Sequence, residues 1–367
     1  MLSLSETQLR WARLRGSGLI EPFASPEAAA SALVGVQAQI VPAAALALWN
    51  RVPAFSLSAF ERALYKERTL VKFAGQRSTL HLYDARDWST VHAGFHNYPT
   101  GWRRWWTRQG KLDVYEAVSE QAGRLLRERG VIGRSDARAA GIDDIHLSGW
   151  GGVFEELVRR GLACHADPAG GEARVAWREH WRPDLAWEPP VQPAAAAELA
   201  RRYLRAFAPA TVNDLAYWGG RYVADARAAL AARGNEVSEV EAGGRTLLAL
   251  TETLDQLAQT PPEPKAWPIR MLFRFDPLLL GHKEKAWIVG EKDYTKVWRP
   301  AGHIEGTLVV EGRVAATWGY ERKTSGVRIT VCPFGRMTAK VQKAVERGAE
   351  GVAAFFGAEL SGLEVGD

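Results

Sequence analysis

The chain has 367 residues, of which 47% are hydrophobic and 24% charged, and its formal net charge is +5. This composition is that of an ordinary soluble protein, long enough for two to four small modules with their own cores. No run of about 18 apolar residues and no signal peptide is present, so we expect a cytoplasmic protein without a membrane span.

The first expected unit, residues 1–110, has the order of a winged helix-turn-helix, which is two or three helices followed by a β-hairpin. Apolar spacing predicts helices in residues 4–16, 25–35, 42–52 and 60–68, and a hairpin over residues 69–83. This unit contains one helix more than the others, and an irregular connector at residues 36–41 separates two of its helices. The connector is therefore where we look for function.

The second expected unit, residues 111–188, is the most regular copy of this pattern. A long helix over residues 112–130 ends at Gly130, Ser135 is the expected N-cap of a short helix, and a third helix covers residues 149–161. Two β-prone runs in residues 162–177 form the expected wing. Cys164 lies in the first of these runs, and we expect it and Cys332 to be buried free thiols.

A third unit, residues 194–260, follows a Pro-rich break. It is expected to contain a helix over residues 194–207, a helix capped by Thr211, a helix over residues 221–234 and a hairpin about Gly243 and Gly244. Residues 266–367 then change to strands and end in a helix over residues 338–356. The fold class is therefore α+β, with three tandem winged helix-turn-helix units and a C-terminal β-rich region, and the repeated module predicts binding to nucleic acid.

Positive charge is concentrated in the first unit. Residues 1–110 contain 13 Lys and Arg against 7 Asp and Glu, a surplus of six. The segment Trp102 to Lys111 places Arg103 and Arg104 among three tryptophans, a mixture that suits a phosphate backbone. The alternative is that the tryptophans pack against a neighbouring module while the arginines are solvated.

The connector contains the sequence Gln37-Ala38-Gln39 between Gly35 and Pro42. A glycine ends helices readily, and a residue before proline prefers an extended conformation. In an extended segment Gln37 and Gln39 point to the same side, so that two amides converge on one point. In a helix they would lie about 200° apart and could not share a site. On spacing alone, surface or capping glutamines are the competing interpretation.

Other chemical constellations are weak. His92 and His96 have the i,i+4 spacing of a helical metal site, but no glutamate of an HExxH motif and no third ligand accompany them, and we expect no metal and no cofactor. We recognise neither a Ser-His-Asp set nor a Cys-His pair. Asp276 precedes a proline and can cap a turn. A strand is expected over residues 285–290. If it is extended from Lys283 onward, Lys283 and Lys285 point to the same side and face a ligand groove.

Four segments resemble the winged-helix DNA glycosylases of the AlkZ/YcaQ family: VGVQAQIVPAAALALWNR, LVKFAGQRSTLHLY, ELARRYLRAFAPATVNDLAYWGG and MLFRFDPLLLGHKEK. They are spread over nearly the whole chain. The AlkZ branch, which confers azinomycin B resistance and unhooks DNA interstrand crosslinks, carries a Gln-apolar-Gln motif, whereas another branch has aspartate at the second position. Gln39 therefore places the resemblance with the AlkZ branch.

The resemblance implies a concave, basic DNA-binding surface with Gln37 and Gln39 as catalytic residues. It further implies a monofunctional glycosylase that uses water to release N7-alkylated guanine from duplex DNA, and we expect a monomer. An amide cannot act as a general base, but a base alkylated at N7 is cationic and needs no general acid. Two amides can then position a water beneath C1′, with their carbonyls toward it and their NH₂ groups toward phosphate, sugar or backbone.

A guanine tied to the opposite strand cannot swing out of the duplex freely, so we expect an open groove rather than a deep aromatic base pocket. The residues expected to contact phosphates are Arg77, His81, Arg103, Arg104, Lys283 and Lys285. A hairpin over residues 306–318 is expected either to enter the minor groove or to be purely structural.

Two other classes of protein remain open. A non-catalytic winged-helix regulator would place Arg159, Arg160, Arg221 and Tyr222 on exposed recognition helices and would dimerise on paired half-sites. An acyl- or nucleotide-processing enzyme would use His81 or His303.

Overall fold

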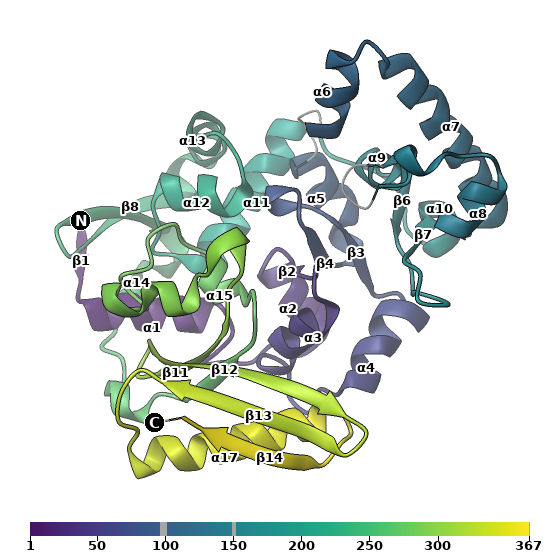
Figure 1. Ribbon diagram of the computed structural model, residues 1–367. Helices are drawn as coiled ribbons and strands as arrows, with labels where there is room; N and C mark the ends of the chain where they lie inside the picture. Colours follow the sequence, from purple (N-terminus) through teal and green to yellow (C-terminus); the bar gives the residue numbers. More distant parts are fainter. Residues whose placement is uncertain (96–100, 149–151, 367) are drawn as a thin grey trace.

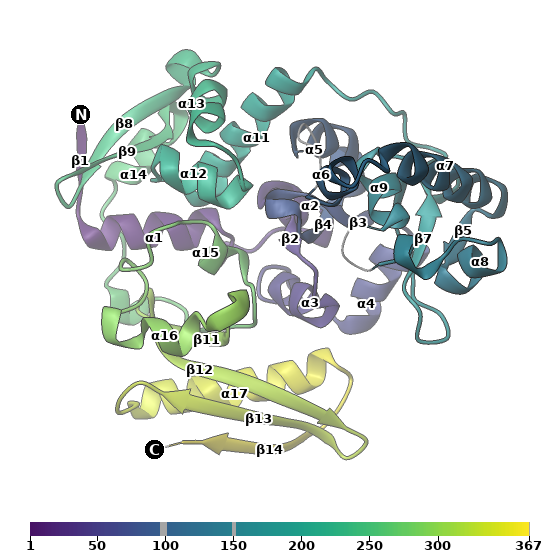
Figure 2. The same cartoon turned by 45° about the horizontal axis from the view of Figure 1, so that its top comes forward.

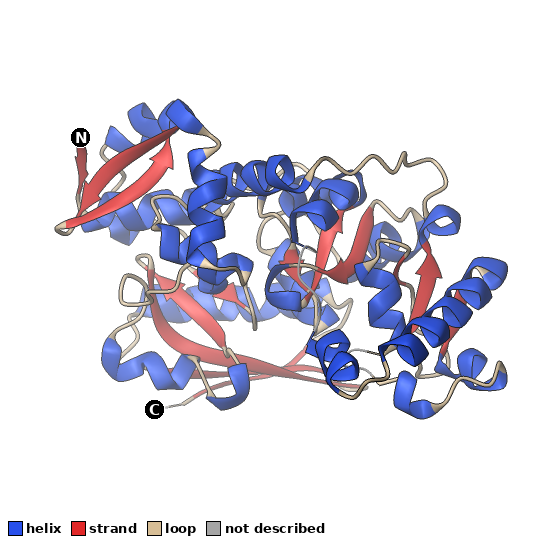
Figure 3. Cartoon of the chain, turned by 90° about the horizontal axis from the view of Figure 1, so that it is seen from above, coloured by secondary structure: helices blue, strands red, loops and turns tan. Residues whose placement is uncertain are grey.

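The computed structural model describes residues 1–95, 101–148 and 152–366, which form a mixed α+β fold with three sheets (Figure 1). Seen from above, the helices surround three separate groups of strands (Figure 3). The strand orders are β2-β4-β3-β6-β7-β5, β1-β8-β9 and β10-β11-β12-β13-β14.

Residues 1–110 contain the helices and the hairpin that the sequence predicts. Their elements are β1 (Leu2–Leu4), α1 (Glu6–Gly16), α2 (Pro26–Ala32), β2 (Val36–Gln37), α3 (Val41–Trp49), α4 (Leu57–Glu61) with a π-helical turn (Arg62–Lys66), β3 (Leu70–Ala74), β4 (Leu80–Asp84), α5 (Trp88–Phe95) and α6 (Gly101–Arg108). Ser5, Ser25 and Ser56 cap α1, α2 and α4 through their hydroxyls, which satisfies amide groups that the first helical turn leaves unpaired.

Residues 111–188 also follow the predicted order. Their elements are α7 (Leu112–Arg129), β5 (Val131–Gly133), α8 (Arg134–Ala139), α9 (Val153–Arg159), β6 (Ala163–His165), β7 (Arg174–Trp177) and α10 (Arg178–Trp181). Gly130 ends α7 with φ of 78° as predicted. The predicted Ser135 cap is wrong: Gly133 is the N-cap of α8, and Ser135 instead donates hydrogen bonds from its amide and hydroxyl to Glu172.

These two proposed units share one sheet, since β3 pairs with β6 through Lys72 and His165. The repeated sequence pattern predicts each hairpin separately, but it does not predict that the hairpins of neighbouring units pair into one sheet. The long connection after α10 then crosses to the third unit (Figure 2).

Residues 194–260 confirm the predicted helices, the cap and the hairpin. Their elements are α11 (Gln192–Phe207), α12 (Val212–Gly219), α13 (Val223–Ala231), β8 (Val237–Ala242), β9 (Arg245–Leu250) and α14 (Leu254–Ala258). Thr211 and Asp214 form a capping box at the start of α12. β1 from the start of the chain adds to β8 in parallel, so the N-terminus belongs to the sheet of this third unit.

The C-terminal region is a five-stranded sheet with one long helix packed on it (Figure 2). Its elements are β10 (Arg270–Leu272), α15 (Pro277–Leu280), α16 (Tyr294–Val297), β11 (Gly306–Val310), β12 (Arg313–Lys323), β13 (Gly326–Pro333), α17 (Ala339–Phe355) and β14 (Leu360–Val365). α17 buries Val341, Val345, Ala349 and Val352, the helical spacing that the sequence showed.

The strand predicted over residues 285–290 is wrong. The amides of Ile288 and Val289 both donate to the carbonyl of Lys285, which makes a turn, and both side chains are buried. Two consecutive buried residues do not fit the alternation of a half-buried strand. A short apolar run alone does not distinguish a strand from a buried turn or helical segment. The burial predicted for Cys332 is also wrong, because its side chain is exposed on β13, whereas Cys164 is buried.

Candidate active site

The connector begins as an extended segment, as the Gly35 boundary predicted, but Val41, the residue before Pro42, is not extended as expected, because it is the first residue of α3. β2 pairs antiparallel with β4 through Val36 and Gln37, and the amide of Ala38 donates to the carbonyl of Leu80 at 2.7 Å. Gly35 has φ of +94°, and a Cβ there would lie 2.3 Å from the ring of Tyr83. Only glycine fits this position, because both the backbone conformation and the space exclude a side chain.

The two glutamines of the connector lie side by side. Nε2 of Gln37 donates to Oε1 of Gln39 at 3.3 Å. Val36 and Ala38 point the other way and are fully buried, while Gln37 is 6% exposed and Gln39 is exposed. The alternation expected for an extended segment is therefore confirmed, and the helical alternative is wrong.

Arg77 fixes the orientation of the Gln37 amide. One of its nitrogens donates to Oε1 of Gln37 at 2.9 Å, and another donates to the backbone carbonyl of Trp218 at 2.6 Å. Since a guanidinium has donors only, the Gln37 atom facing it must be the oxygen. The NH₂ group of Gln37 is then directed at Gln39, rather than at the phosphate, sugar or backbone partner expected from the sequence.

The backbone of Arg77 is held from the third unit. Arg77 has φ of 54°, and Gly220 at the end of α12 approaches it so closely that a Cβ on Gly220 would lie 2.7 Å from the Arg77 Cα. The carbonyl of Trp218 that Arg77 binds lies in the last turn of α12. Two elements far apart in sequence thus set one side chain beside the glutamine pair.

His81 lies beside Gln37, because the two residues are directly paired across β4 and β2 and their side chains lie on the same face of the sheet. It is 3% exposed, and its Nδ1 donates to the carbonyl of Thr79 at 2.8 Å when it is neutral. Burial, together with the nearby positive charge of Arg77, lowers the pKa of His81 to about 3. A buried, neutral imidazole does not suit the phosphate contact expected from the sequence, so we no longer assign that contact to His81.

The glutamine pair opens into a groove with a volume of about 1080 Å³. Its opposite wall comes from the C-terminal region, and the side chains along both walls include a large share of aromatic rings. Among the lining residues are Gln37, Gln39, Arg77, Tyr217, Phe275, Tyr294, Trp298 and His303. The site is an open groove, as expected, but its aromatic wall was not expected.

A buried ion pair joins the two walls. Arg51, just after α3, makes two 2.8 Å hydrogen bonds with the carboxylate of Asp276, and neither side chain is exposed. Asp276 also accepts from the amide of Leu278, which confirms the predicted cap. This pair ties the C-terminal end of α3, the helix that follows the connector, to the start of α15 in the C-terminal region.

Besides Arg77, two more of the lysines and arginines expected to contact DNA are engaged within the protein. Lys285 is 6% exposed, and its ammonium group donates to the carbonyls of Leu279, at 2.8 Å, and His282. Arg103 pairs with Glu116 and with Glu156, the latter at 3.0 Å. Arg104 and Lys283 are exposed and remain suited to phosphates.

One of the tryptophans near Arg103 packs against the second unit, whereas another is exposed. Trp106 is 3% exposed and stacks on Tyr115 and His146 of the second unit, with ring centroids 5.8 Å and 5.0 Å away. This is the alternative in which the segment packs against a neighbouring module. Trp105, in contrast, is 38% exposed.

The helices that a regulator would use for recognition are partly occupied by contacts within the chain. Arg160 pairs with Glu156 at 2.9 Å, Arg159 is half-buried, and Arg221 lies over the ring of Phe95 at 5.0 Å. Tyr222 is 68% exposed.

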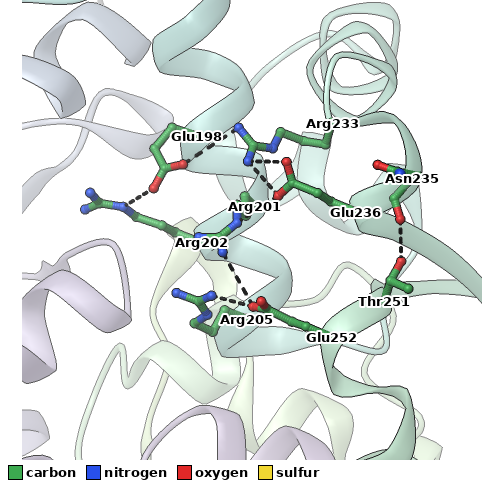
Figure 4. A network of polar contacts seen from close by, with 9 residues as sticks. All are labelled: Glu198, Arg201, Arg202, Arg205, Arg233, Asn235, Glu236, Thr251 and Glu252. Atoms are coloured by element: carbon green, nitrogen blue, oxygen red, sulfur yellow. Dashed lines mark hydrogen bonds and ion pairs between the residues drawn. The ribbon is translucent and has the colours of Figure 1, made fainter.

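Arginines on α11 and just after α13 are also neutralised, by a network of carboxylates (Figure 4). The pairs are Arg201 with Glu236 at 3.0 Å and Glu252 at 3.6 Å, Arg202 with Glu198 at 2.9 Å, Arg205 with Glu252, and Arg233 with Glu236 at 2.6 Å and Glu198 at 3.9 Å. Free cations therefore do not dominate this face of the third unit.

The remaining sequence features have structural roles where they are described. Nε2 of His92 donates to the carbonyl of Arg159 at 2.8 Å, while His96 lies outside the described residues. Within residues 1–95, 101–148 and 152–366 no group of three potential metal ligands is found. In the same part of the chain no helix combines the length and the apolar character needed to cross a membrane.

The turn between β11 and β12 is packed rather than projecting. A Cβ on Gly312 would lie 2.7 Å from the ring of Trp267 and 3.4 Å from Leu14 of α1. This packing favours the structural interpretation of the hairpin over residues 306–318.

Sequence reasoning missed the aromatic wall of the groove. Tyr294 and Trp298 have an i,i+4 spacing, the signal of two rings on the same face of a helical turn. That signal was present but was hidden by the large number of tryptophans in the chain.

Comparisons with known proteins place this arrangement in a family. Residues 30–355 match the family described as DNA glycosylase AlkZ-like. A curated Streptomyces sahachiroi protein named interstrand DNA cross-link repair glycosylase is 29% identical over 362 residues, covering 92% of this chain and 93% of the relative. The solved structure of Streptomyces sahachiroi DNA glycosylase AlkZ covers both chains completely, with a TM-score of 0.81 and 27% identity.

Proposed function

Because the chain belongs to the AlkZ-like DNA glycosylase family, we propose that it hydrolyses the N-glycosidic bond of N7-alkylated guanine in duplex DNA. The observation that carries the proposal is the pair of hydrogen-bonded amides, Gln37 and Gln39, at the wall of an open groove. Family membership makes the chain a DNA glycosylase, and the amide pair is what narrows the substrate to a cationic base.

The amide pair suits a reaction in which the leaving group needs no acid. A guanine alkylated at N7 carries a positive charge, so it departs as a neutral base when the bond from its N9 to C1′ breaks. The sugar is left with oxocarbenium character, and water adds to C1′ and loses its proton to solvent in the open groove. A neutral base would require protonation first, which glutamine cannot supply.

The hydrogen bonds define where such a water would lie. Each amide oxygen has two lone pairs. Oε1 of Gln37 accepts one hydrogen bond from Arg77, and Oε1 of Gln39 accepts one from Gln37, so each oxygen retains a lone pair. A water that donates one hydrogen to each oxygen would present its own lone pair to C1′, and this fixed geometry supplies the rate enhancement.

Arg77 acts in this scheme as a positioning residue rather than as a phosphate contact. Its guanidinium is shared between Gln37 and the end of α12, so it holds the first amide of the chain of hydrogen bonds. We further propose that the natural substrates are bulky N7 adducts and interstrand crosslinks made by an alkylating natural product such as azinomycin B, and that the protein acts as a monomer. An open groove supports this proposal, since a tethered base need not enter a closed pocket.

The function is tested by incubating the protein with duplexes that contain either N7-methylguanine or uracil. We expect release of free N7-methylguanine and an abasic site, with no release of the neutral base uracil. A crosslinked duplex should separate into single strands on a denaturing gel after treatment. Equal release of uracil, or a covalent protein–DNA product trapped by borohydride, would contradict a water-based mechanism restricted to cationic bases.

A further inference from the structure

Two stacked aromatic rings lie on the groove wall that comes from the C-terminal region. The rings of Tyr294 and Trp298 are 5.0 Å apart between centroids and within 14° of parallel. Both line the groove into which Gln37 and Gln39 open. Tyr294 is 42% exposed, so part of its ring is accessible from the groove.

The ring pair is supported from within the protein. The ammonium group of Lys285 lies 5.4 Å from the ring centroid of Trp298 and 4.7 Å from that of Tyr217, another residue of the groove. Lys285 is itself fixed by hydrogen bonds to two backbone carbonyls. These contacts hold the Trp298 ring in place, so Trp298 is a stable support beneath Tyr294.

The backbone of this segment is anchored as well. Val297 is fully buried, its carbonyl accepts from the amide of Glu305 at 3.0 Å, and Trp298 forms a β-bridge with Ile304. The outer ring is thus carried by an ordered element rather than by a loosely attached loop.

The surroundings of the rings do not make a phosphate site. Lys296 pairs with Asp293 at 2.7 Å, and Arg299 lies 3.6 Å from Glu305. These cations have carboxylate partners, and the rings of Tyr294 and Trp298 form the planar, apolar part of this wall.

The groove is also larger than a water and a deoxyribose require. Pockets for drug-sized ligands are about 300–1000 Å³, and this groove has about 1080 Å³. A groove of this size has room for a base together with a substituent.

We propose that Tyr294, backed by Trp298, is a stacking platform for a planar aromatic group of the damaged nucleotide. The inference rests on the proposed function. Aromatic rings prefer offset stacks with centroids 4.5–7 Å apart, and stacking of a base on such a ring contributes about 1–3 kcal/mol. The planar group is either the nucleobase itself or an aromatic substituent carried by the adduct, and Tyr294 offers the same chemistry to both.

Base release under single-turnover conditions tests the platform. Three duplexes carry guanine alkylated at N7 with a methyl, a benzyl or a cyclohexylmethyl group, so that the last two differ in planarity at similar size. Each is incubated with the wild type, with Tyr294→Leu and with Tyr294→Phe, after thermal melting has shown equal stability. Tyr294→Phe keeps the ring and is the matched control.

We expect Tyr294→Leu to reduce kcat/KM by about tenfold on at least the benzyl adduct, with Tyr294→Phe close to the wild type. A loss confined to the benzyl adduct identifies the substituent as the stacked group, and an equal loss on all three identifies the base. Rates within twofold of the wild type on all three duplexes overturn the platform. If instead the wild type releases no base from any duplex, the proposed function itself fails.

Discussion

The guanidinium of Arg77 donates to Oε1 of Gln37 at 2.9 Å and to the carbonyl of Trp218 at 2.6 Å. This relationship connects the glutamine pair of the first unit to the end of α12 in the third. The orientation of the Gln37 amide therefore depends on tertiary structure that the connector itself does not contain.

Replacing Arg77 by lysine should slow catalysis while leaving DNA affinity nearly unchanged. A lysine keeps the positive charge, but its single ammonium group cannot reproduce the planar fork that holds both acceptors. We expect the single-turnover rate of base release to fall by about tenfold or more, which corresponds to about 1.4 kcal/mol. Kinetics and DNA-binding titrations on the same preparation measure both quantities. A parallel Arg104→Lys variant should behave like the wild type, and an unchanged rate for Arg77→Lys would remove Arg77 from the scheme.

Breaking the Arg51–Asp276 pair should strongly destabilise the fold. Asp276→Ala leaves a buried, unpaired guanidinium, which typically costs about 3–5 kcal/mol. Urea denaturation measures the free energy of unfolding. Glu364→Ala, which removes an exposed partner of Arg328, is the control, and its effect should stay within about 1 kcal/mol. A comparably small effect of Asp276→Ala would show that the pair does not hold the two walls together.

Acid should destabilise the protein below about pH 6.5 through buried histidines. Burial lowers the pKa of His81 and of His165 to about 3. Between about pH 3 and pH 6.5 these histidines are therefore protonated in the unfolded state but remain neutral in the folded state. Stability is then fully present above the unfolded pKa near 6.5 and is lost as the pH falls toward 3. Each such histidine contributes up to about 1.4 kcal/mol per pH unit.

Thermal melting between pH 7 and pH 5 tests this dependence, in a range where most carboxylates remain ionised. The His81→Gln variant should show a shallower loss of stability than the wild type, because one group that resists protonation is gone. Parallel curves for the two proteins would mean that His81 accepts a proton in the folded state.

The arginines of α6 should differ in their effect on salt dependence. Arg104 is exposed, whereas Arg103 is paired with Glu116 and Glu156. If α6 lies along the DNA backbone, Arg104→Ala should reduce the slope of log affinity against log salt concentration by about 0.9, the value for one phosphate contact. Arg103→Ala should leave the slope unchanged. Fluorescence anisotropy at several salt concentrations measures the slopes, and equal slopes for wild type and Arg104→Ala would place α6 away from DNA.

Local sequence rules predicted most of the elements, because caps, glycines and apolar spacing act within a few residues. Thr211 with Asp214, Gly130 and the extended connector at Gln37 are examples. The rules failed where long-range contacts decide. Ser135 hydrogen-bonds to Glu172, which is distant in sequence, and therefore does not cap α8 as expected. The residues after Lys285 form a buried turn although their composition favours a strand.

The candidate site was predictable only in part. The alternation of an extended chain places Gln37 beside Gln39, so the pair could be derived from the sequence. Arg77, which orients the Gln37 amide, was expected to bind phosphate. Its actual contact with Trp218 could not be predicted from the sequence, because that contact depends on how the first and third units pack against each other. The aromatic wall at Tyr294 comes from a distant segment and could be placed in the site only by the fold.

The most direct test of the glutamine mechanism compares the wild type with a Gln37→Ala/Gln39→Ala double variant on a duplex with radiolabelled N7-methylguanine. Loss of preorganised polar groups at a reacting centre commonly costs about 10²–10³ in rate. We predict release of the labelled base by the wild type and a loss of at least that size in the double variant, with DNA binding and melting temperature preserved. Release by the folded double variant at the wild-type rate would contradict a catalytic role for the two amides.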